Sequence, residues 1–218
     1  MQYKKLLFVI AISIFLLGAC NGESPTLKMY EHMEQAVTLE ESFAEQQQPL
    51  VDLEQQEKEL YEEIINMGLD EFERVKELSQ EALSSIESRE EIIEVEKESI
   101  DAAMEEFRKI EPLIEEIEEE QVKEKAQQMY STMDERYEAY LSLHEAYTNS
   151  INEDKELYQM LQNENLEEEE LKSQIETVNT SYDEVIKANE TFNTKTDEYN
   201  NLKKEFYQLA EVNVEYNE

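Results

Sequence analysis

Apolar side chains recur at alternating steps of three and four residues along most of the sequence after residue 25. This spacing places an apolar stripe on one face of a helix and predicts long amphipathic helices. Only three glycines and three prolines occur in 218 residues, which leaves little material for the turns of a sheet. High charge can indicate disorder, but the regular spacing favours folded helices. The clearest stripe comprises Phe72, Ser79, Leu83, Ile86, Ile93, Ile100, Met104, Phe107 and Ile114, with charged residues such as Glu90 and Lys97 on the remaining steps.

Capping signals mark where the first two helices begin and end. Ser24-Pro25 is typical of a helix start, with serine as the N-cap and proline at the first helical position. Gly68 suits the left-handed conformation that often follows a last turn. Asp70 with Glu73 predicts a capping box that opens the second helix.

Two prolines fall inside the apolar stripes. We expect a kink at Pro49, because proline removes one helical hydrogen bond and clashes with the preceding turn. The second stripe keeps its phase through Pro112, which favours a kink over a chain reversal, with the reversal as the alternative. We expect the turn into the third helix near 118–121, where apolar residues lapse.

The third helix is expected over roughly 122–161, and Asn165 with Glu168 predicts a capping box that opens a fourth helix ending near Leu209. Long helices joined by short turns must pack antiparallel. The sequence therefore predicts an all-α fold: an elongated up-and-down bundle of four helices, forming one domain over 25–218 and on the order of 65 Å long. The alternative is a three-helix bundle with one long kinked helix.

The first twenty residues have the pattern of a lipoprotein signal. Two lysines precede an uncharged apolar run over 6–17, and Gly18 and Ala19 lead directly to Cys20, the only cysteine. A signal peptidase that acts on lipid-modified cysteine needs small residues before the cut and a thiol to receive a diacylglyceryl group. We predict that residues 1–19 are removed and that Cys20 carries the lipid.

The alternatives are an ordinary cleaved signal and an N-terminal membrane anchor. The apolar run is too short for an anchor, since spanning a bilayer takes about 20 residues. An ordinary signal would carry Cys20 at this position only by coincidence. Acyl chains such as palmitate on Cys20 would hold the protein at the outer face of the cytoplasmic membrane, with 20–24 as a short tether.

Acidic residues dominate the charge, because 55 Asp and Glu oppose 19 Lys and Arg. Loss of Lys4 and Lys5 with the signal changes the formal net charge from −36 to −38. This charge argues against nucleic-acid binding and against adhesion to anionic lipid through a basic patch. With Cys20 acylated, no thiol remains for a disulfide or for catalysis.

The sequence shows no catalytic or metal-binding pattern. A di-metal bundle needs Glu-x-x-His on two helices, but Met29 and Leu141 stand three residues before His32 and His144. A zinc site would need several His or Cys ligands. We therefore expect no catalytic residues, no metal and no cofactor.

Three further features have a structural and a functional interpretation. Glutamate runs at 115–120 and 167–170 are typical of solvated helix ends, with weak cation binding as the alternative. Five tyrosines of the third helix are expected to fill a wide seam, with an exposed glycan-binding face as the alternative. They are Tyr130, Tyr137, Tyr140, Tyr147 and Tyr158. Five asparagines of the fourth helix are expected to face solvent, with Asn189 in the seam and fixing the register as the alternative. They are Asn179, Asn189, Asn193, Asn200 and Asn201.

Several short segments carry a resemblance to a known family. After the cysteine come KMYEH at 28–32, EQQQPL at 45–50, MGLDEF at 67–72, DERYEAY at 134–140 and DKELY at 154–158. Together they resemble the YkyA-like cell-wall-binding lipoproteins of Gram-positive bacteria. The resemblance implies a helical-bundle lipoprotein on the outer face of the cytoplasmic membrane, beneath the wall, and it carries over no catalytic residues.

We therefore expect a non-enzymatic docking or spacer module of the cell envelope. Its partners would be the membrane, through the lipid on Cys20, and peptidoglycan or another envelope protein. A cation-responsive surface protein and a wall hydrolase using two carboxylates are the alternatives. Anionic wall polymers would repel a charge of −38 within a Debye length of about 8 Å, so direct wall affinity needs bridging cations or a neutral glycan-binding face. The sequence specifies neither.

Overall fold

The computed structural model describes residues 24–67 and 71–212, and every regular element within these ranges is helical. The first rod of the bundle consists of α1 (Pro25–Leu39) and α2 (Glu41–Ile65). The second consists of α3 (Phe72–Phe107), the 3₁₀ segment η2 (Arg108–Ile110) and α4 (Glu111–Glu115). The third and fourth are single helices, α5 (Glu120–Met160) and α6 (Glu168–Leu209).

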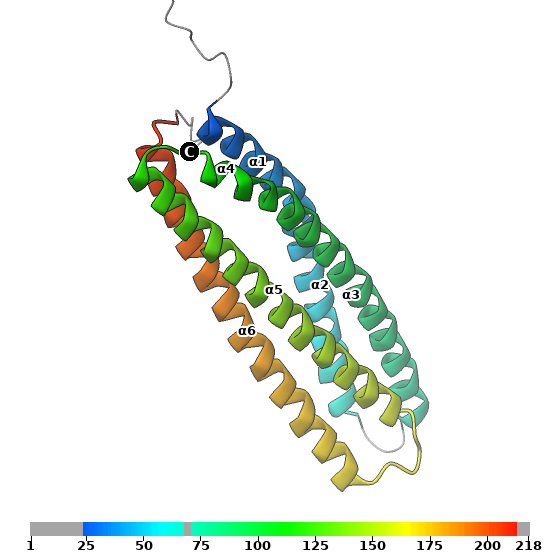
Figure 1. Cartoon of the computed structure of the whole chain (residues 1–218). Coiled ribbons are helices and arrows are strands. Elements are labelled where there is room, and N and C mark those ends of the chain that lie inside the picture. Colours follow the sequence, from blue (N-terminus) through cyan, green and yellow to red (C-terminus); the bar gives the residue numbers. More distant parts are fainter. Residues whose placement is uncertain (1–23, 68–70, 213–218) are drawn as a thin grey trace, which may run out of the picture.

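The four rods run alternately in opposite directions (Figure 1). Helix α2 packs against α3, and α5 packs against α6. The two hairpins meet where α3 packs against α5. At 1.5 Å per residue, the 42-residue helix α6 is about 63 Å long. The all-α, elongated four-helix bundle expected from the sequence is confirmed.

Ser24 caps α1 as the sequence predicts. Its hydroxyl oxygen accepts a hydrogen bond from the backbone N–H of Leu27 at 3.2 Å, and Pro25 stands at the first helical position. Cys20, the predicted lipidation site, and Gly68 and Asp70, the predicted capping residues, lie outside the described residues.

The first rod is interrupted at Glu40, and α2 runs through Pro49 without a break. The interruption therefore lies before the proline at which the sequence places a kink. The Ser99 hydroxyl donates to the Leu39 carbonyl at 2.6 Å and accepts from the Phe43 N–H at 3.2 Å. In an unbroken helix this N–H would bond directly to that carbonyl. A side chain of α3 is thus inserted into the hydrogen-bond ladder, a known cause of a helix bend.

Pro112 accounts for the 3₁₀ segment after α3. Proline has no N–H, so the Arg108 carbonyl lacks its usual helical donor and accepts from the Glu111 N–H instead. The chain continues through this segment and reverses only at 116–119, between α4 and α5. The bend at the proline and the turn near 118–121 agree with the sequence-based expectation.

The capping box expected at Asn165 is wrong. Helix α6 begins at Glu168, and its N-cap Glu167 makes no side-chain hydrogen bond to the helix. The side-chain oxygen of Asn163 accepts a hydrogen bond from the Asn165 N–H at 3.1 Å. Asparagine side chains can mimic a backbone turn in this way, so Asn163 shapes the loop before the helix.

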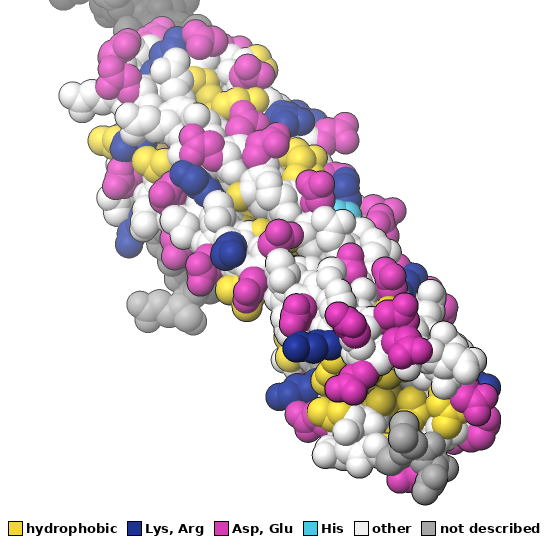
Figure 2. All heavy atoms as spheres, turned by 90° about the horizontal axis from the view of Figure 1, so that it is seen from below, with side chains coloured by type: hydrophobic (Ala, Val, Ile, Leu, Met, Phe, Trp, Pro, Cys, Tyr) yellow, Lys and Arg dark blue, Asp and Glu magenta, His cyan; other side chains and the backbone are white. Residues whose placement is uncertain are grey.

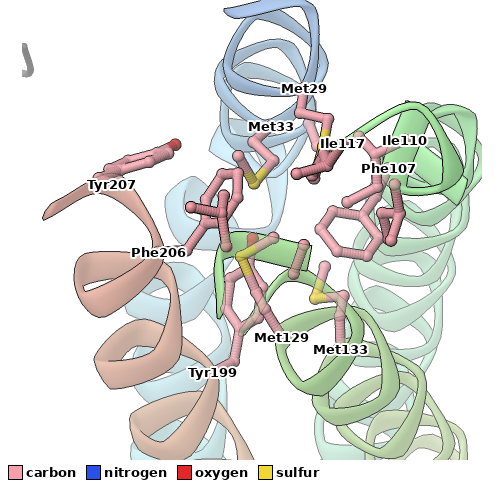
Figure 3. Packing of buried hydrophobic residues seen from close by; sticks show 14 of the residues in the cluster. Met29, Met33, Phe107, Ile110, Ile117, Met129, Met133, Tyr199, Phe206 and Tyr207 are labelled. Atoms are coloured by element: carbon pink, nitrogen blue, oxygen red, sulfur yellow. The ribbon is translucent and has the colours of Figure 1, made fainter. Parts of the chain in front are cut away.

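Methionine and aromatic side chains fill the end of the bundle that holds the start of α1 (Figure 3). Met29 and Met33 from α1 lie in one cluster with Phe107 from α3, Met129 from α5 and Phe206 from α6. Unbranched methionine side chains adapt to irregular gaps between rings. All four rods therefore contribute to a common core at this end.

On α3, the charged residues that face the core are each one position before those predicted from the sequence. The sequence places Glu90 and Lys97 on core-facing steps, but the structure buries Arg89 and Glu96 instead. Both sets keep the alternating three-and-four spacing, because each can be threaded between Ile86 and later isoleucines. The apolar residues alone therefore do not decide which charged neighbour faces the core.

The surface carries the acidic charge of the composition. Figure 2 shows Asp and Glu side chains over most of the visible face, with fewer Lys and Arg scattered among them. Among the described helices, none combines the length and apolar character that crossing a membrane requires.

Candidate functional site

A fully buried arginine joins all four rods of the bundle. Arg89 on α3 forms ion pairs with Glu57 on α2 and, at 3.1 Å, with Asp154 on α5. Its Nε and Nη2 groups donate to the hydroxyl of Tyr147 on α5 at 3.2 and 3.1 Å, and Nη2 also donates to Tyr182 on α6 at 3.1 Å. A buried charge is tolerated when it is paired and hydrogen-bonded in this way. We call these five residues the Arg89 centre.

The Arg89 centre places one cation between two carboxylates. Burial raises the pKa of Glu57 to about 7, although the attraction of Arg89 acts in the opposite direction. Burial also raises the pKa of Asp154, whose Oδ2 accepts a hydrogen bond from Tyr182 at 2.6 Å. Because internal partners already surround the guanidinium, this centre serves as a cross-link between helices rather than as a binding site for an external anion.

Beside the Arg89 centre, a groove separates α2 from α6. Within the described ranges, no Cα atom of α2 comes within 8 Å of a Cα atom of α6, whereas α2 and α3 pack closely. Two cavities of about 480 and 430 Å³ occupy this space, and both are lined by Glu54 and Tyr182. The lining residues on α2 extend from Phe43 to Tyr61, which corresponds to about 27 Å along the helix.

Aromatic rings form much of the wall of the first, larger-volume cavity of this pair. Phe43 on α2 and Phe192 on α6 meet edge to face with their centroids 6.0 Å apart, and Tyr140 packs against both rings. Val51 on α2 and Ile186 on α6 also line this cavity and are 54% and 56% exposed. Apolar side chains that remain exposed around a concave surface are typical of a binding site.

Polar groups lie among these rings. A Glu96 carboxylate oxygen accepts a hydrogen bond from Gln47 Nε2 at 2.7 Å, and burial raises the pKa of Glu96 to about 7. Glu54 accepts a hydrogen bond from the Tyr147 hydroxyl. The first cavity thus combines apolar walls, in which Tyr140 and Phe192 are nearly fully buried, with carboxylate and amide groups that can orient a ligand.

His144 borders the same cavity with an unsatisfied nitrogen. Its Nε2 is buried without a hydrogen-bond partner, and the nearest carboxylate oxygen, on Glu94, is 3.8 Å away. Burial lowers the pKa of His144, so its imidazole is neutral at neutral pH. The unpartnered nitrogen lies on the side of Glu94, which does not line the cavity, so it is not assigned to ligand binding.

The tyrosines of α5 fill the seam as expected, and three of them also border the groove. Tyr140 and Tyr147 line the first cavity, and Tyr158 lines the second. Tyr130 and Tyr137 pack beside the methionine-rich core at the other end. Tyr140, Tyr147 and Tyr158 are 2%, 8% and 2% exposed, so the seam interpretation is the one that describes them.

The asparagines of α6 are all exposed, as expected. Asn189 lies at the edge of the groove rather than in the seam, and its Oδ1 accepts a hydrogen bond from Asn193 Nδ2 at 2.6 Å. His32 is hydrogen-bonded to Glu106 at 2.7 Å. Over residues 24–67 and 71–212, no three or more His, Cys, Asp and Glu side chains are grouped so that they could hold a metal ion.

Sequence reasoning missed both the Arg89 centre and the groove. The available signal for Arg89 was its position three residues after Ile86 and four before Ile93, in step with the apolar stripe. The available signals for the groove were Val51 and Ile186, which stand outside the predicted stripes of their helices. An extra apolar residue beside a stripe is common on surfaces, so neither signal was specific.

The fold has a counterpart among solved structures. It is similar to a 1.6 Å crystal structure of a conserved protein of unknown function from Staphylococcus aureus, with a TM-score of 0.59 and 12% sequence identity. The match covers 86% of this chain and 98% of that one. At this identity the likeness supports the fold alone.

Sequence comparison identifies the family. The YkyA family, described as "Putative cell-wall binding lipoprotein", matches residues 24–209. A Bacillus subtilis (strain 168) protein named "Uncharacterized lipoprotein YkyA" is 31% identical over 156 residues, which cover 72% of this chain and 70% of that protein. The match spans α1 to the end of α6 and includes both walls of the groove. The chain therefore belongs to the YkyA family of lipoproteins.

Proposed function

We propose that this protein is a non-enzymatic binding module of the cell envelope, held at the outer face of the cytoplasmic membrane by lipid on Cys20. The groove between α2 and α6 is the observation that carries the proposal, since it provides a ligand-sized concave surface with apolar walls. Membership in a family of lipoproteins described as cell-wall binding supports the same assignment.

The ligand that suits this groove best is wall glycan. The partly exposed rings of Phe43 and Tyr182 offer apolar surface to sugar rings, and Gln47, Asn189 and Asn193 offer amide groups to sugar hydroxyls. Stacking and hydrogen bonding of this kind do not depend on attraction to anionic wall polymers, which a strongly acidic protein repels.

Retention on purified sacculi tests this proposal. The full-length protein, purified from membranes, should sediment with peptidoglycan stripped of its anionic polymers, and added salt should change this little because stacking is only weakly screened. The double variant Val51→Asp/Ile186→Asp places two charges at the groove and should lose most of the retention.

A matched control shows whether added charge alone lowers retention on sacculi. Val37 on α1 and Val95 on α3 are also exposed apolar residues, at 48% and 41%, and neither lines the groove. The double variant Val37→Asp/Val95→Asp should be retained like the unchanged protein. Equal retention of both double variants would overturn the assignment of wall binding to the groove.

One observation favours a second candidate, a carboxylate-dependent wall hydrolase. Glu54 and Glu96 line the same cavity, and a carboxyl with a pKa of about 7, as at Glu96, is suited to general-acid catalysis. Both carboxylates are, however, engaged by internal hydrogen bonds from Gln47 and Tyr147. Release of soluble muropeptides by the unchanged protein, abolished in Glu96→Gln, would establish the hydrolase.

A further inference from the structure

The first rod contacts α6 before the break at Glu40 and separates from it afterwards. Before the break, the rings of Tyr30 and Tyr207 meet edge to face with their centroids 5.4 Å apart. Glu34 on α1 accepts a hydrogen bond from the Tyr207 hydroxyl at 3.1 Å and pairs with Lys203 at 3.4 Å. These contacts close the seam between the first rod and α6 along the length of α1.

Direct contacts of this kind end three residues after the break. The last is the edge-to-face pair of Phe43 and Phe192. Beyond Phe43, the residues that the structure describes on α2 form hydrogen bonds and ion pairs with α2, α3 and α5, and none with α6. Phe43 is also the first residue of α2 that lines the groove. The groove therefore begins directly after the break.

Ser99 of α3 fixes the backbone at the beginning of the groove. Its hydroxyl bonds to both groups that an unbroken helix would join, the Leu39 carbonyl at 2.6 Å and the Phe43 N–H at 3.2 Å. Ser99 is buried and lines neither cavity. Because the hydroxyl holds the Phe43 N–H, it also determines where the Phe43 ring stands in the groove wall.

Arg136 of α5 holds the same break from another side. Its Nη1 and Nη2 groups donate to the two carboxylate oxygens of Glu40, each at 2.8 Å, and its Nε donates to the Thr196 hydroxyl on α6 at 3.0 Å. A bidentate pair between arginine and a carboxylate fixes orientation as well as distance. Arg136 is buried and, like Ser99, lines neither cavity. Polar side chains from α3 and α5 therefore hold the first rod at its break.

Pro49 does not explain where the groove begins. Proline is a common cause of helix bends, but α2 runs through Pro49 without interruption. The proline also stands six residues after Phe43, where the direct contacts with α6 have already ended. The contacts at Glu40 are the ones that coincide with the separation of α2 from α6.

We propose that Ser99 and Arg136 are positioning residues of the groove: they hold the first rod bent at Glu40, and this bend directs α2 away from α6. The assignment rests on the proposed function of the groove as a binding site, and it adds two residues that act on the site without lining it. In a straight first rod, α2 would continue beside α6 as α1 does, and the space for a ligand would shrink.

Two distances measured in spin-labelled full-length protein test this proposal. Labels at Glu31 and Glu62, which are both exposed, report the length of the first rod. A straight helix would place their Cα atoms about 46 Å apart, and a bend shortens this distance. Labels at Lys58 on α2 and Asn179 on α6, which both line the second cavity, report the width of the groove.

Ser99→Ala should lengthen the first distance and shorten the second, because the Leu39 carbonyl and the Phe43 N–H can then bond to each other. Retention on sacculi should fall as the groove narrows. Ser99→Thr keeps the hydroxyl and should preserve both distances. Glu40→Gln, which weakens the pair with Arg136, should change both distances in the same direction as Ser99→Ala.

Ser79→Ala is the matched control. Ser79 is a fully buried serine of the same helix, and its hydroxyl has no hydrogen-bond partner. The variant therefore removes a buried hydroxyl without releasing any backbone group, and it should leave both distances and the retention on sacculi unchanged.

The outcomes separate this inference from the proposed function. A rod length unchanged by Ser99→Ala, or a longer rod with an unchanged groove width, overturns the positioning role. Equal changes in Ser99→Ala and Ser79→Ala mean general loosening of the bundle and also overturn it. Unchanged distances in Glu40→Gln overturn the assignment of Arg136. A narrower groove with full retention on sacculi supports the positioning role and overturns wall binding at the groove.

Discussion

Arg89 on α3 and Asp154 on α5 are joined by an ion pair of 3.1 Å, with side-chain exposures of 0% and 4%. The pair connects the α2–α3 hairpin to the α5–α6 hairpin at a level where α2 and α6 stand apart. The Arg89 centre therefore connects the helices beneath the groove, although no Cα atoms of α2 and α6 come within 8 Å of each other in the described ranges.

Replacing Arg89 with methionine should lower the free energy of unfolding by about 3–5 kcal/mol, because Glu57 and Asp154 would stay buried without a counter-charge. Urea unfolding followed by circular dichroism measures this. Adding Glu57→Gln and Asp154→Asn should recover most of the loss. Arg74→Met is the control, since Arg74 is 45% exposed and surface ion pairs such as its own contribute little to stability. A loss for Arg89→Met no larger than that of the control would contradict the prediction.

Glu96 should make the protein less stable as the pH rises. Burial raises its pKa from 4.5 to about 7, so between these values the folded protein keeps a proton that the unfolded chain has released. Its contribution to stability is therefore fully present below pH 4.5 and is lost as the pH rises to about 7.

Glu96→Gln should remove this dependence. Relative to the unchanged protein, the variant should gain on the order of 1–2 kcal/mol in unfolding free energy between pH 4.5 and pH 8, less than the full shift because the groove admits water. Unfolding curves at both pH values measure the difference. Glu98→Gln should show no such gain, and a gain of equal size there would refute the role of burial.

Phe206→Ala should cost about 3–5 kcal/mol of unfolding free energy, because the ring is fully buried among methionines from two other rods. Leu209→Ala on the same helix is the comparison, since Leu209 is 40% exposed and should lose far less. Thermal and urea unfolding of both variants provide the measurement. Similar losses would show that this end of the bundle is not packed as Figure 3 shows it.

Cys20→Ser should prevent lipid attachment and move the protein out of the washed membrane fraction, or leave its signal uncleaved. Labelling of growing cells with a fatty-acid analogue should mark the unchanged protein and not the variant. Mass spectrometry of the purified amino terminus gives a direct reading. An unmodified amino end on protein released into the medium would refute the anchor.

The helices were predictable because their apolar residues repeat with a period that only one backbone conformation satisfies. The bend at Pro112 also followed from the sequence, since the missing N–H acts on its own helix. The break at Glu40 did not, because its cause is Ser99, a residue of a different helix. A sequence signal within one helix predicts an effect on that helix. It does not predict an effect caused by a residue of another helix.

The candidate site was harder to predict than the fold. Arg89 and Glu90 are both charged and adjacent in the sequence, yet one is fully buried and the other reaches a surface lysine. The difference depends on where Glu57 and Asp154 stand on two other helices, which requires the packing to be known. The groove likewise depends on the distance between α2 and α6, which cannot be read from the sequence of either helix alone.

Ser24, which caps the start of α1, and Glu54, which lines the groove, are separated by 30 residues of the first rod, or about 45 Å of helix. The start of α1 at Ser24 is therefore held at a fixed distance from a ligand bound in the groove. A molecule built in this way would act as a gauge of the gap between two layers, binding only targets that lie about 45 Å from the start of its first helix.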